Sequence, residues 1–299
     1  MRRADLKVGF ACNNRCVFCA QGDKRARCAS LKLPELIERL RRARPGAEGL
    51  VLTGGEPTLH KNILEIAKAA RALGYRSIQL QTNGRILAYT DALRRLVEAG
   101  ITEVSPSIHG PDAETHDTLT RAPGSWEESA SGIRNAVQAG LPVITNSVIV
   151  RDNVPKLPAL VTLLAELGVR HAQLALVHPV GTALELFDEV APRLSDLPGP
   201  LAAAREVALA HGMRLVTEAV PRCFLRGMQD LAVEDSIPDT TVFDLDASLH
   251  YSSWRKDEGK AHGPPCERCA ERPRCEGPWR EYPEHQGWAE YEPFLEAAE

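Results

Sequence analysis

The sequence predicts an α/β protein built around a buried parallel sheet, with a small cysteine-rich extension at its C-terminal end. Short apolar segments alternate six times with helical segments between residues 6 and 211. The strand segments are apolar enough to be buried on both faces, as in parallel sheets. The segment after Pro221 is instead rich in turns and contains four of the eight cysteines. At 299 residues and 43% hydrophobic, the chain is long enough to bury a large core.

Each strand–helix unit is predicted from its own residues. Pro34 is a good first-turn residue for one helix, Thr90 is a candidate N-cap for another, and glycines end most of the helices. Residues 109–121 are expected to form a long polar loop, and residues 213–217 are a candidate seventh strand. We expect strands at 6–10, 50–52, 77–81, 102–108, 143–150 and 171–177, helices beginning at 34, 63, 91, 125 and 155, and an alanine-rich helix ending at 211.

Composition excludes several classes of protein. The formal net charge of -4 and the pI near 6.2 give no electrostatic footprint for nucleic acid. No uninterrupted apolar window of about 18 residues is present, so a membrane span is not expected. The basic start of the chain enters a strand rather than an apolar signal core. Clustered cysteines without a secretion signal favour metal ligation in a reducing compartment, and we therefore expect a cytoplasmic protein.

Three cysteines follow the first predicted strand closely. Cys12, Cys16 and Cys19 form a C-x3-C-x2-C array within eight residues. Disulfides do not use an odd number of thiols, and tetrahedral zinc normally takes a fourth protein ligand or an open catalytic position. A [4Fe–4S] cluster accepts thiolates from such a loop, and three thiolates leave one iron free. The array therefore predicts a cluster with one open coordination site.

Together with Gly-Gly-Glu-Pro at 54–57 after the second strand, this array resembles the radical S-adenosylmethionine (radical SAM) superfamily. The resemblance covers roughly residues 5–215. It implies a partial (β/α)6 barrel of the TIM type, with its site at the C-terminal ends of the strands. We expect two domains, a radical SAM barrel at 1–215 and an auxiliary-cluster segment at 216–299.

The resemblance also implies how S-adenosylmethionine is held. The open iron chelates the methionine amino and carboxylate groups, glycines 54 and 55 let the backbone approach that amino group, and Glu56 faces the ammonium. Phe18 is either an adenine contact or a core aromatic, and Arg121 is either a carboxylate ligand or a surface guanidinium. His109 departs from the serine-x-aspartate of many relatives and is interpreted as a loop histidine. The implied cofactor-binding residues are Phe18, Gly54, Gly55, Glu56, Pro57, Thr82, Asn83, Ser107, Arg121 and Asn146.

The C-terminal cysteines resemble part of the auxiliary-cluster region of SPASM and twitch-type radical SAM proteins. The C-x2-C-x5-C core at Cys266, Cys269 and Cys275 matches, the further cysteines of a second cluster are absent, and Cys223 completes a set of four. We expect one fully ligated auxiliary [4Fe–4S] cluster, with structural zinc on the same thiolates as the alternative. Cys28 lies outside both sets and is interpreted as a core or loop thiol.

By this resemblance the protein is an oxidoreductase or modifying enzyme. It cleaves S-adenosylmethionine reductively to a 5′-deoxyadenosyl radical, which abstracts hydrogen from a substrate, and the auxiliary cluster accepts an electron. A peptide or protein substrate is favoured, with a small metabolite as the alternative. An electron donor such as flavodoxin or ferredoxin is implied as a partner. Two other classes remain open, an iron–sulfur electron carrier or scaffold and a zinc-stabilised binding module.

Overall fold

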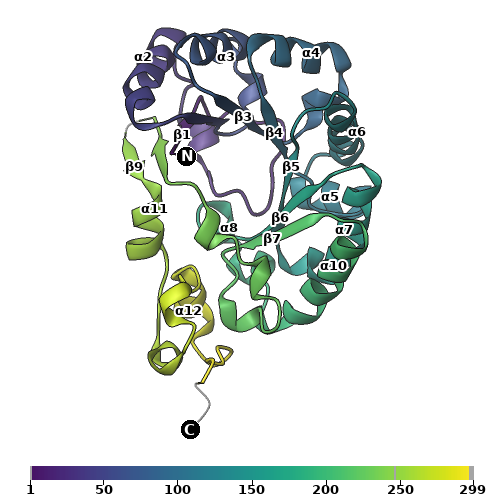
Figure 1. The fold of residues 1–299 in the computed structure, drawn as a ribbon, viewed down its shortest axis with the longest axis vertical. Helices are drawn as coiled ribbons and strands as arrows, with labels where there is room; N and C mark the ends of the chain where they lie inside the picture. The colour runs from purple at the N-terminus through teal and green to yellow at the C-terminus, as the bar shows by residue number, and fades with distance from the viewer. Residues whose placement is uncertain (1, 246, 296–299) are drawn as a thin grey trace.

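The computed structural model describes residues 2–245 and 247–295, and its core is a curved sheet with helices on the outside (Figure 1). The strand that precedes the cysteine array, β1, lies near the middle of the strand order. The strands are β1 (Arg3–Lys7), β2 (Gly49–Thr53), β3 (Ser77–Thr82), β4 (Glu103–Pro106), β5 (Ile144–Ile149), β6 (His171–Leu176), β7 (Arg214–Glu218), β8 (Thr240–Phe243) and β9 (Ser248–His250).

The strands follow the order of an incomplete barrel. One sheet has the order β4-β3-β2-β1-β8-β9, and a second has the order β5-β6-β7. Two isolated parallel bridges, Val104 to Val143 and Ser107 to Asn146, connect β4 with β5. All ladders are parallel except that of β8 with β9. The predicted α/β fold with a partial TIM-type barrel is therefore confirmed.

The helices form because each one buries one apolar face against the outside of the sheet. In α2, Leu36 and Leu40 lie one turn apart and are both fully buried. The longer helices are α2 (Leu33–Ala43), α3 (Ile63–Ala72), α4 (Thr90–Ala99), α5 (Ala113–Thr120), α6 (Ser125–Gln138), α7 (Leu157–Glu166) and α10 (Pro198–Ala210). The shorter helices are α1 (Lys24–Arg27), α8 (Thr182–Glu185), α9 (Phe187–Val190), α11 (Tyr251–Trp254) and α12 (Glu281–Gln286).

The strands divide apolar from polar side chains. In β1, Ala4 and Leu6 belong to the apolar core between sheet and helices, whereas Arg3, Asp5 and Lys7 alternate with them and so point to the other face. The inner face of β1 is consequently polar, unlike the apolar layers that fill a complete (β/α)8 barrel. The described residues contain no helix that combines the length and hydrophobicity needed to cross a membrane.

Two predicted elements differ in the structure, and a third is confirmed. The first strand occupies Arg3–Lys7 rather than 6–10, because β1 pairs along these residues with both β2 and β8. The predicted polar loop at 109–121 contains α5. Its sequence has a weak apolar period, but Asp112 caps the helix by accepting a hydrogen bond from the Thr115 backbone at 2.8 Å. The candidate seventh strand at 213–217 is confirmed as β7 (Arg214–Glu218).

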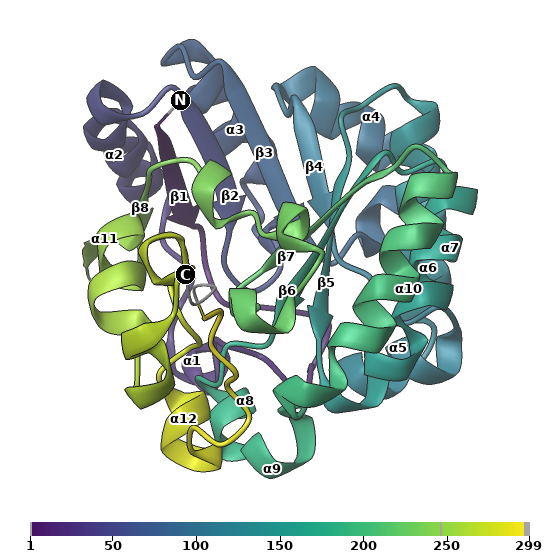
Figure 2. The same ribbon diagram turned by 60° about the horizontal axis from the view of Figure 1, so that its bottom comes forward.

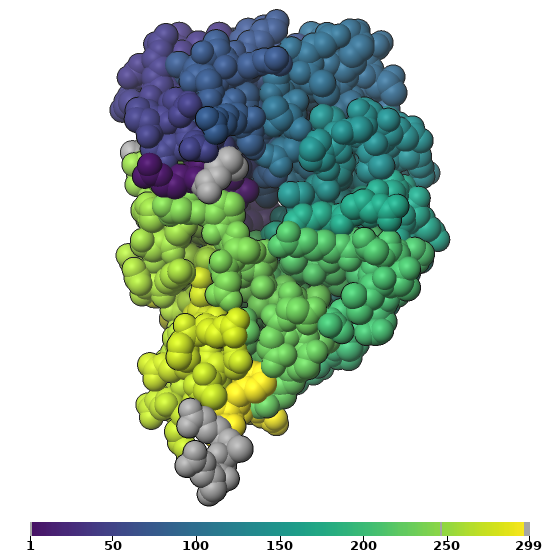
Figure 3. All heavy atoms as spheres, in the orientation of Figure 1, coloured from purple at the N-terminus to yellow at the C-terminus, as the bar shows by residue number. Residues whose placement is uncertain are grey.

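After β7, the C-terminal part of the chain first adds a strand to the barrel sheet and then forms the cysteine-rich segment outside it. β8 extends the sheet beside β1, although this segment was predicted to be poor in strands. The cysteine-rich turns and α12 then lie near α8 and α9 (Figure 2), where Phe187 of α9 stacks on His285 of α12 at 4.2 Å. In the space-filling view the last described residues form a lobe at one end of the molecule (Figure 3). The division at residues 215 and 216 stays a prediction, and β7 spans it.

Candidate functional site

The first cysteine array lies in the loop that follows β1. Cys12, Cys16 and Cys19 are each partly buried. The backbone N–H of Asn14 points at the Cys12 sulfur at 3.4 Å, and the Cys19 N–H donates to the Cys16 carbonyl at 3.2 Å. The loop thus brings the three thiols to one side of the strand end, as the sequence spacing predicts.

The surroundings of these thiols favour a positively charged occupant. Burial raises the pKa of Cys16 far above that of an ordinary thiol, and the neighbouring Cys19 and Cys12 add to the shift. Burial also raises the pKa of Cys12. Three thiolates held this close repel one another unless a metal centre balances their charge. The donor set therefore fits an iron–sulfur cluster.

The Gly-Gly-Glu-Pro loop after β2 is fastened directly to the cysteine loop. The Gly55 N–H donates to the Gly9 carbonyl at 2.9 Å, and the Glu56 N–H donates to the Ala11 carbonyl at 2.8 Å. A Cβ on Gly55 would lie 2.4 Å from the Phe10 carbonyl oxygen, and one on Gly54 would lie 2.1 Å from that of Gly9. The close approach that requires glycine in this structure is to the cysteine loop, and the approach of a bound amino group to this backbone stays a prediction.

Glu56 joins the ends of β2 and β3. Its carboxylate is buried and accepts hydrogen bonds from the Thr58 N–H at 3.0 Å, the Thr58 hydroxyl at 2.6 Å, the Thr82 hydroxyl at 2.8 Å and the Asn83 N–H at 2.7 Å. Burial raises the pKa of this carboxyl, and the hydrogen bonds oppose the shift. Pro57 is buried at the first turn of the 3₁₀ helix that follows. The Glu56 carboxylate and the Thr82 hydroxyl therefore hold the loops in place.

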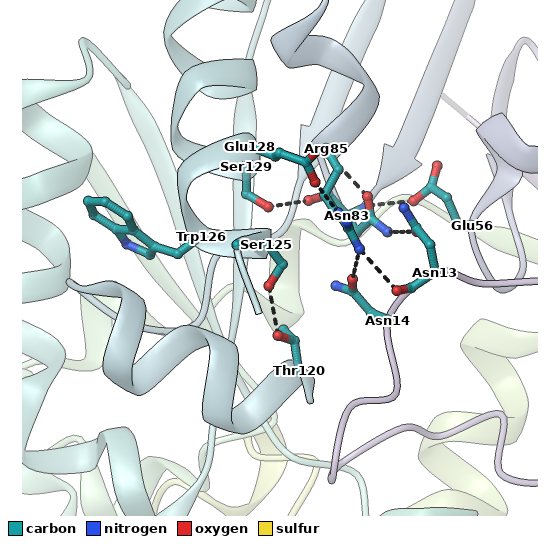
Figure 4. A network of polar contacts seen from close by, with 12 residues as sticks. Asn13, Asn14, Glu56, Asn83, Arg85, Thr120, Ser125, Trp126, Glu128 and Ser129 are labelled. Atoms are coloured by element: carbon teal, nitrogen blue, oxygen red, sulfur yellow. Dashed lines mark hydrogen bonds and ion pairs between the residues drawn. The ribbon is translucent and has the colours of Figure 1, made fainter. Parts of the chain in front are cut away.

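A polar network connects the cysteine loop to the end of β3 (Figure 4). The Asn83 amide donates to Asn13 Oδ1 at 2.6 Å. Arg85 donates to the Asn13 carbonyl at 3.0 Å and to Asn14 Oδ1 at 2.9 Å, and it pairs with Glu128 of α6 at 2.5 Å. Sequence reasoning identified Asn83 alone among these residues. No local pattern in the sequence marks the others, because their bonds join loops about 70 residues apart.

Ser107 follows the end of β4, whereas Asn146 lies in the middle of β5 rather than at its end. Ser107 and Asn146 are bridged in parallel, so their side chains are neighbours. The Oδ1 atom of Asn146 is buried and has no hydrogen-bond partner among the described residues. Because an unsatisfied buried acceptor is costly, this position suits a ligand that donates a hydrogen bond. The role of these two residues in binding the cofactor stays a prediction.

Phe18 packs in the core beside two buried histidines. Its ring meets His109 edge-on at 4.7 Å, and His109 stacks on His116 at 5.5 Å. His109 Nδ1 accepts the Val148 N–H at 3.1 Å, and burial lowers the pKa of His109 well below its ordinary value. The imidazole is therefore neutral, with its proton on Nε2. His109 is a buried part of this layer, which its interpretation as a loop histidine did not anticipate.

Arg121 ends α5 close to the cysteine loop. The loop runs along the end of this helix, since the Arg15 N–H donates to the Thr120 carbonyl at 2.7 Å and the Val17 N–H to the Leu119 carbonyl at 3.0 Å. Arg121 has a left-handed backbone with φ of 49° and an exposed side chain. The guanidinium is thus free to turn toward the cysteine loop or toward solvent.

The four C-terminal cysteines line one hollow. Cys223 comes from a 3₁₀ turn after β7, whereas Cys266, Cys269 and Cys275 come from turns beyond α11. The residues that line this hollow include all four cysteines and Tyr291. Chain segments more than 40 residues apart in the sequence therefore meet here. This proximity agrees with the prediction that the four cysteines form one ligand set.

The electrostatics of this second group resemble those of the first. Burial raises the pKa of Cys223 to about 12, and Cys275 and Cys266 add to the shift. The wall of this hollow includes an ion pair of Arg222 with Glu271 at 2.7 Å.

Cys28 lies apart from both cysteine groups in the sequence. It follows α1, where its backbone N–H donates to the Lys24 carbonyl at 2.8 Å. In the described part of the chain, no three His, Cys, Asp or Glu side chains converge at single-ion distance.

Comparison with known sequences gives one family and several relatives. The family model described as the radical SAM superfamily matches residues 6–169. A probable GTP 3′,8-cyclase of Saccharolobus islandicus is 32% identical over 189 residues, 62% of this chain and 60% of that protein. An AdoMet-dependent heme synthase of Oleidesulfovibrio alaskensis is 34% identical over 141 residues, 47% of this chain and 36% of that protein. The matched segment thus spans 60% or less of these two curated relatives.

Comparison with solved structures supports the fold. SuiB of Streptococcus suis bound to S-adenosylmethionine superposes with a TM-score of 0.67 at 14% identity, over 99% of this chain and 76% of SuiB. The same protein bound to its precursor peptide SuiA gives a TM-score of 0.68 at 13% identity, over 99% and 75%. At 13–14% identity, these matches show that the chain shares its fold with SuiB and show nothing beyond the fold.

Proposed function

Because this chain belongs to the radical SAM superfamily, we propose that it is an enzyme that binds a [4Fe–4S] cluster on Cys12, Cys16 and Cys19 and cleaves S-adenosylmethionine. The bound cluster supplies one electron for this cleavage to methionine and a 5′-deoxyadenosyl radical, which takes a hydrogen atom from the substrate. The chain itself supplies ligands, orientation and exclusion of water.

One observation carries this proposal, the direct fastening of the Gly-Gly-Glu-Pro loop to the cysteine loop. Hydrogen bonds from Gly55 and Glu56 to the residues just before Cys12 fix both loops at the same strand ends. An S-adenosylmethionine bound on the open iron then meets backbone groups whose positions are already set. Preorganisation of this kind lowers the entropic cost of binding.

The remaining positions have roles that follow from their surroundings. Asn146, with its unsatisfied Oδ1, accepts a hydrogen bond from the ligand, and Ser107 contributes its hydroxyl beside it. Phe18 supports an apolar wall for the adenine through its packing on His109. Arg121 reaches the ligand carboxylate from the end of α5. The residues proposed to bind the cofactor through backbone or side chain are Phe18, Gly54, Gly55, Glu56, Pro57, Thr82, Asn83, Ser107, Arg121 and Asn146.

We further propose that the C-terminal cysteines hold an auxiliary [4Fe–4S] cluster, in a SPASM/twitch-like segment at 216–299. All four thiols line one hollow, yet no three His, Cys, Asp or Glu side chains of the described residues lie close enough together to hold a single metal ion. A single zinc ion draws its four thiolates to about 2.3 Å from one point, so the wider spacing suits a cluster better than zinc. Ligation by Cys223, Cys266, Cys269 and Cys275 leaves no iron open, so this site serves electron transfer or structural support.

The substrate is proposed to be a peptide or protein. The main support is the similarity in fold to SuiB, of which one structure contains a precursor peptide. The alternative is a small metabolite, in line with the relative named GTP 3′,8-cyclase. An electron carrier of another class would need a fourth ligand on the first cluster, and Cys28 is the nearby candidate. A flavodoxin or ferredoxin in the cytoplasm is the proposed electron donor.

The experiment that tests this function uses anaerobically reconstituted full-length protein. S-adenosylmethionine is expected to shift the electron paramagnetic resonance signal of the reduced protein, because the ligand binds an iron directly. Cys28→Ser is the matched control and retains both the cluster and the shift. An unshifted signal, or loss of the first cluster in Cys28→Ser, would favour an electron carrier instead. Product mass spectrometry with candidate peptides and nucleotides then separates the two substrate classes.

A further inference from the structure

The loop that follows β6 rests directly on the first cysteine loop. The Thr182 N–H and the Gly22 N–H both donate to the Cys19 carbonyl, at 3.0 Å and 3.2 Å. A Cβ on Gly181 would lie 2.7 Å from the Gly22 nitrogen and 2.8 Å from the Cys19 carbonyl oxygen. The two loops are therefore packed backbone to backbone. Any displacement of residues 178–182 is transmitted to the position of Cys19.

At the start of this loop, His178 contacts the C-terminal segment. Its imidazole stacks on the indole of Trp279 with centroids 3.7 Å apart and an interplanar angle of 10°. Burial and the nearby Lys260 lower the pKa of His178 to about 3, so the stack is one of neutral rings. Such aromatic pairs stabilise a contact beyond the area they bury. Here the contact joins the barrel to the cysteine-rich segment.

Trp279 is in turn held rigidly beside the second cysteine group. It lies four residues after Cys275, with a turn between them in which the Gly277 N–H points at the Cys275 sulfur at 3.4 Å. Its backbone is bridged to Lys260, and the Lys260 ammonium lies 3.7 Å from the centre of its ring. A cation over an indole is attracted to the face of the ring, and more strongly when it is buried. The position of Trp279 is therefore fixed by the structure around Cys275.

We propose that His178 and Trp279 are positioning residues that couple the two cysteine sites. Order at the C-terminal site fixes Trp279, Trp279 fixes His178, and the 178–182 loop then holds Cys19 in place. The coupling is reciprocal, because both sites bias the same packed contact. It predicts that S-adenosylmethionine binds more tightly when the C-terminal site is intact. The part of the inference that concerns this ligand rests on the proposed function.

The first test needs no bound group. Hydrogen exchange is measured on the metal-free, anaerobically reduced full chain, in peptides that cover residues 16–22 and 178–185. His178→Ala is expected to speed exchange of the Gly22 and Thr182 amides on the order of 5-fold or more, as expected for coupling of 1 kcal/mol or more. His178→Phe keeps the stack and is expected to restore slow exchange. Leu209→Ala, at an exposed position of α10, is the control.

The outcome of this test decides the inference directly. Faster exchange confined to the two loops, together with rescue by His178→Phe, supports it. Wild-type exchange in His178→Ala, a uniform increase over the whole chain, or an equal effect of Leu209→Ala would overturn it. His178 is the better probe because Trp279 is almost fully buried and its truncation threatens the fold.

The second test is a double-mutant cycle on reconstituted protein. Cys269→Ser is expected to weaken S-adenosylmethionine binding about 5-fold or more in the wild-type background and to have little further effect in His178→Ala. Additive effects would overturn the coupling. Complete absence of S-adenosylmethionine binding in the wild type would instead contradict the proposed function, while the exchange measurement would still decide the role of His178 and Trp279.

Discussion

The backbone N–H of Glu56 donates to the carbonyl of Ala11 at 2.8 Å, one residue before the first cysteine of the array. This bond joins two loops that are 45 residues apart in sequence, a separation given by their residue numbers. The Glu56 side chain extends the connection to the end of β3 through Thr82 and Asn83. One residue thus aligns three neighbouring strand ends, and the predictions below begin with this connection.

Gly55→Ala is expected to disrupt the contact between the two loops. A methyl group there meets the backbone carbonyls of Phe10 and Ala11 at 2.4 Å and 2.5 Å, and backbone cannot turn aside as a side chain does. Overpacking of this kind costs about 1–3 kcal/mol or more. Urea unfolding should show the loss, and S-adenosylmethionine binding should weaken with it. Gly199→Ala, which meets nothing within 4 Å, is the control and should be neutral or stabilising.

Glu56→Gln is expected to destabilise the fold although it preserves shape. Both carboxylate oxygens accept hydrogen bonds, from Thr58, Thr82 and Asn83. In the glutamine variant one oxygen is replaced by an NH2 group, which is a donor and cannot accept the hydrogen bond offered at that position. The expected loss is about 1–3 kcal/mol in the free energy of unfolding. Glu65→Gln on the exposed face of α3 provides the comparison, with an expected change below about 0.5 kcal/mol. Equal stability of the two variants would contradict the structural role of Glu56.

Lys260 is expected to make stability depend on pH between 8 and 10.5. Burial lowers its pKa from 10.5 to about 8, although the nearby Glu234, Glu276 and Glu218 oppose the shift and Arg255 adds to it. Between these values the unfolded chain keeps a proton that the folded chain has released. The free energy of unfolding therefore rises with pH across this window, by about 3 kcal/mol.

Lys260→Met removes this contribution and retains most of the side-chain volume. Urea unfolding of the metal-free protein at several pH values should show the wild type gaining stability relative to Lys260→Met as the pH rises from 8 to 10.5. The comparison cancels the tyrosines and thiols that titrate in the same range. Parallel stability curves for the two proteins would show that Lys260 keeps an ordinary pKa.

Cys269→Ser is expected to remove one of the two clusters and leave the other. Reconstituted wild-type protein should contain roughly eight irons per chain, and the variant roughly four. Cys28→Ser should match the wild type, because Cys28 lies outside both sets. An unchanged iron content in Cys269→Ser, or stoichiometric zinc in its place in the wild type, would contradict the auxiliary cluster.

Much of the architecture was predictable because it follows local patterns. The alternation of strands and helices, the three-cysteine array and the four-cysteine set all depend on spacing along the chain. The prediction was less accurate where tertiary pairing decides, as in β1, whose polar residues Arg3, Asp5 and Lys7 face the barrel interior. Helix α5 was missed because its N-cap Asp112, rather than an apolar stripe, defines its start.

The cysteines of the candidate site could be predicted from the sequence, but the residues that hold the cysteine loops in place could not. The bonds of Arg85 to Asn13 and Asn14 join loops about 70 residues apart, and no local pattern marks them. The same is true of His178 and Trp279, which meet only because the C-terminal segment folds back on the barrel. The reason for glycine at position 55 also required the structure.

Formation of 5′-deoxyadenosine is the measurement that tests the central claim most directly. Anaerobically reconstituted protein with a full complement of iron is incubated with dithionite and S-adenosylmethionine, and the products are separated by liquid chromatography with mass detection. We expect 5′-deoxyadenosine and methionine in equal amounts from the wild type and from Cys28→Ser, and neither from Cys16→Ala. Iron-loaded wild-type protein that forms no 5′-deoxyadenosine would contradict the claim that Cys12, Cys16 and Cys19 hold a cluster that cleaves S-adenosylmethionine.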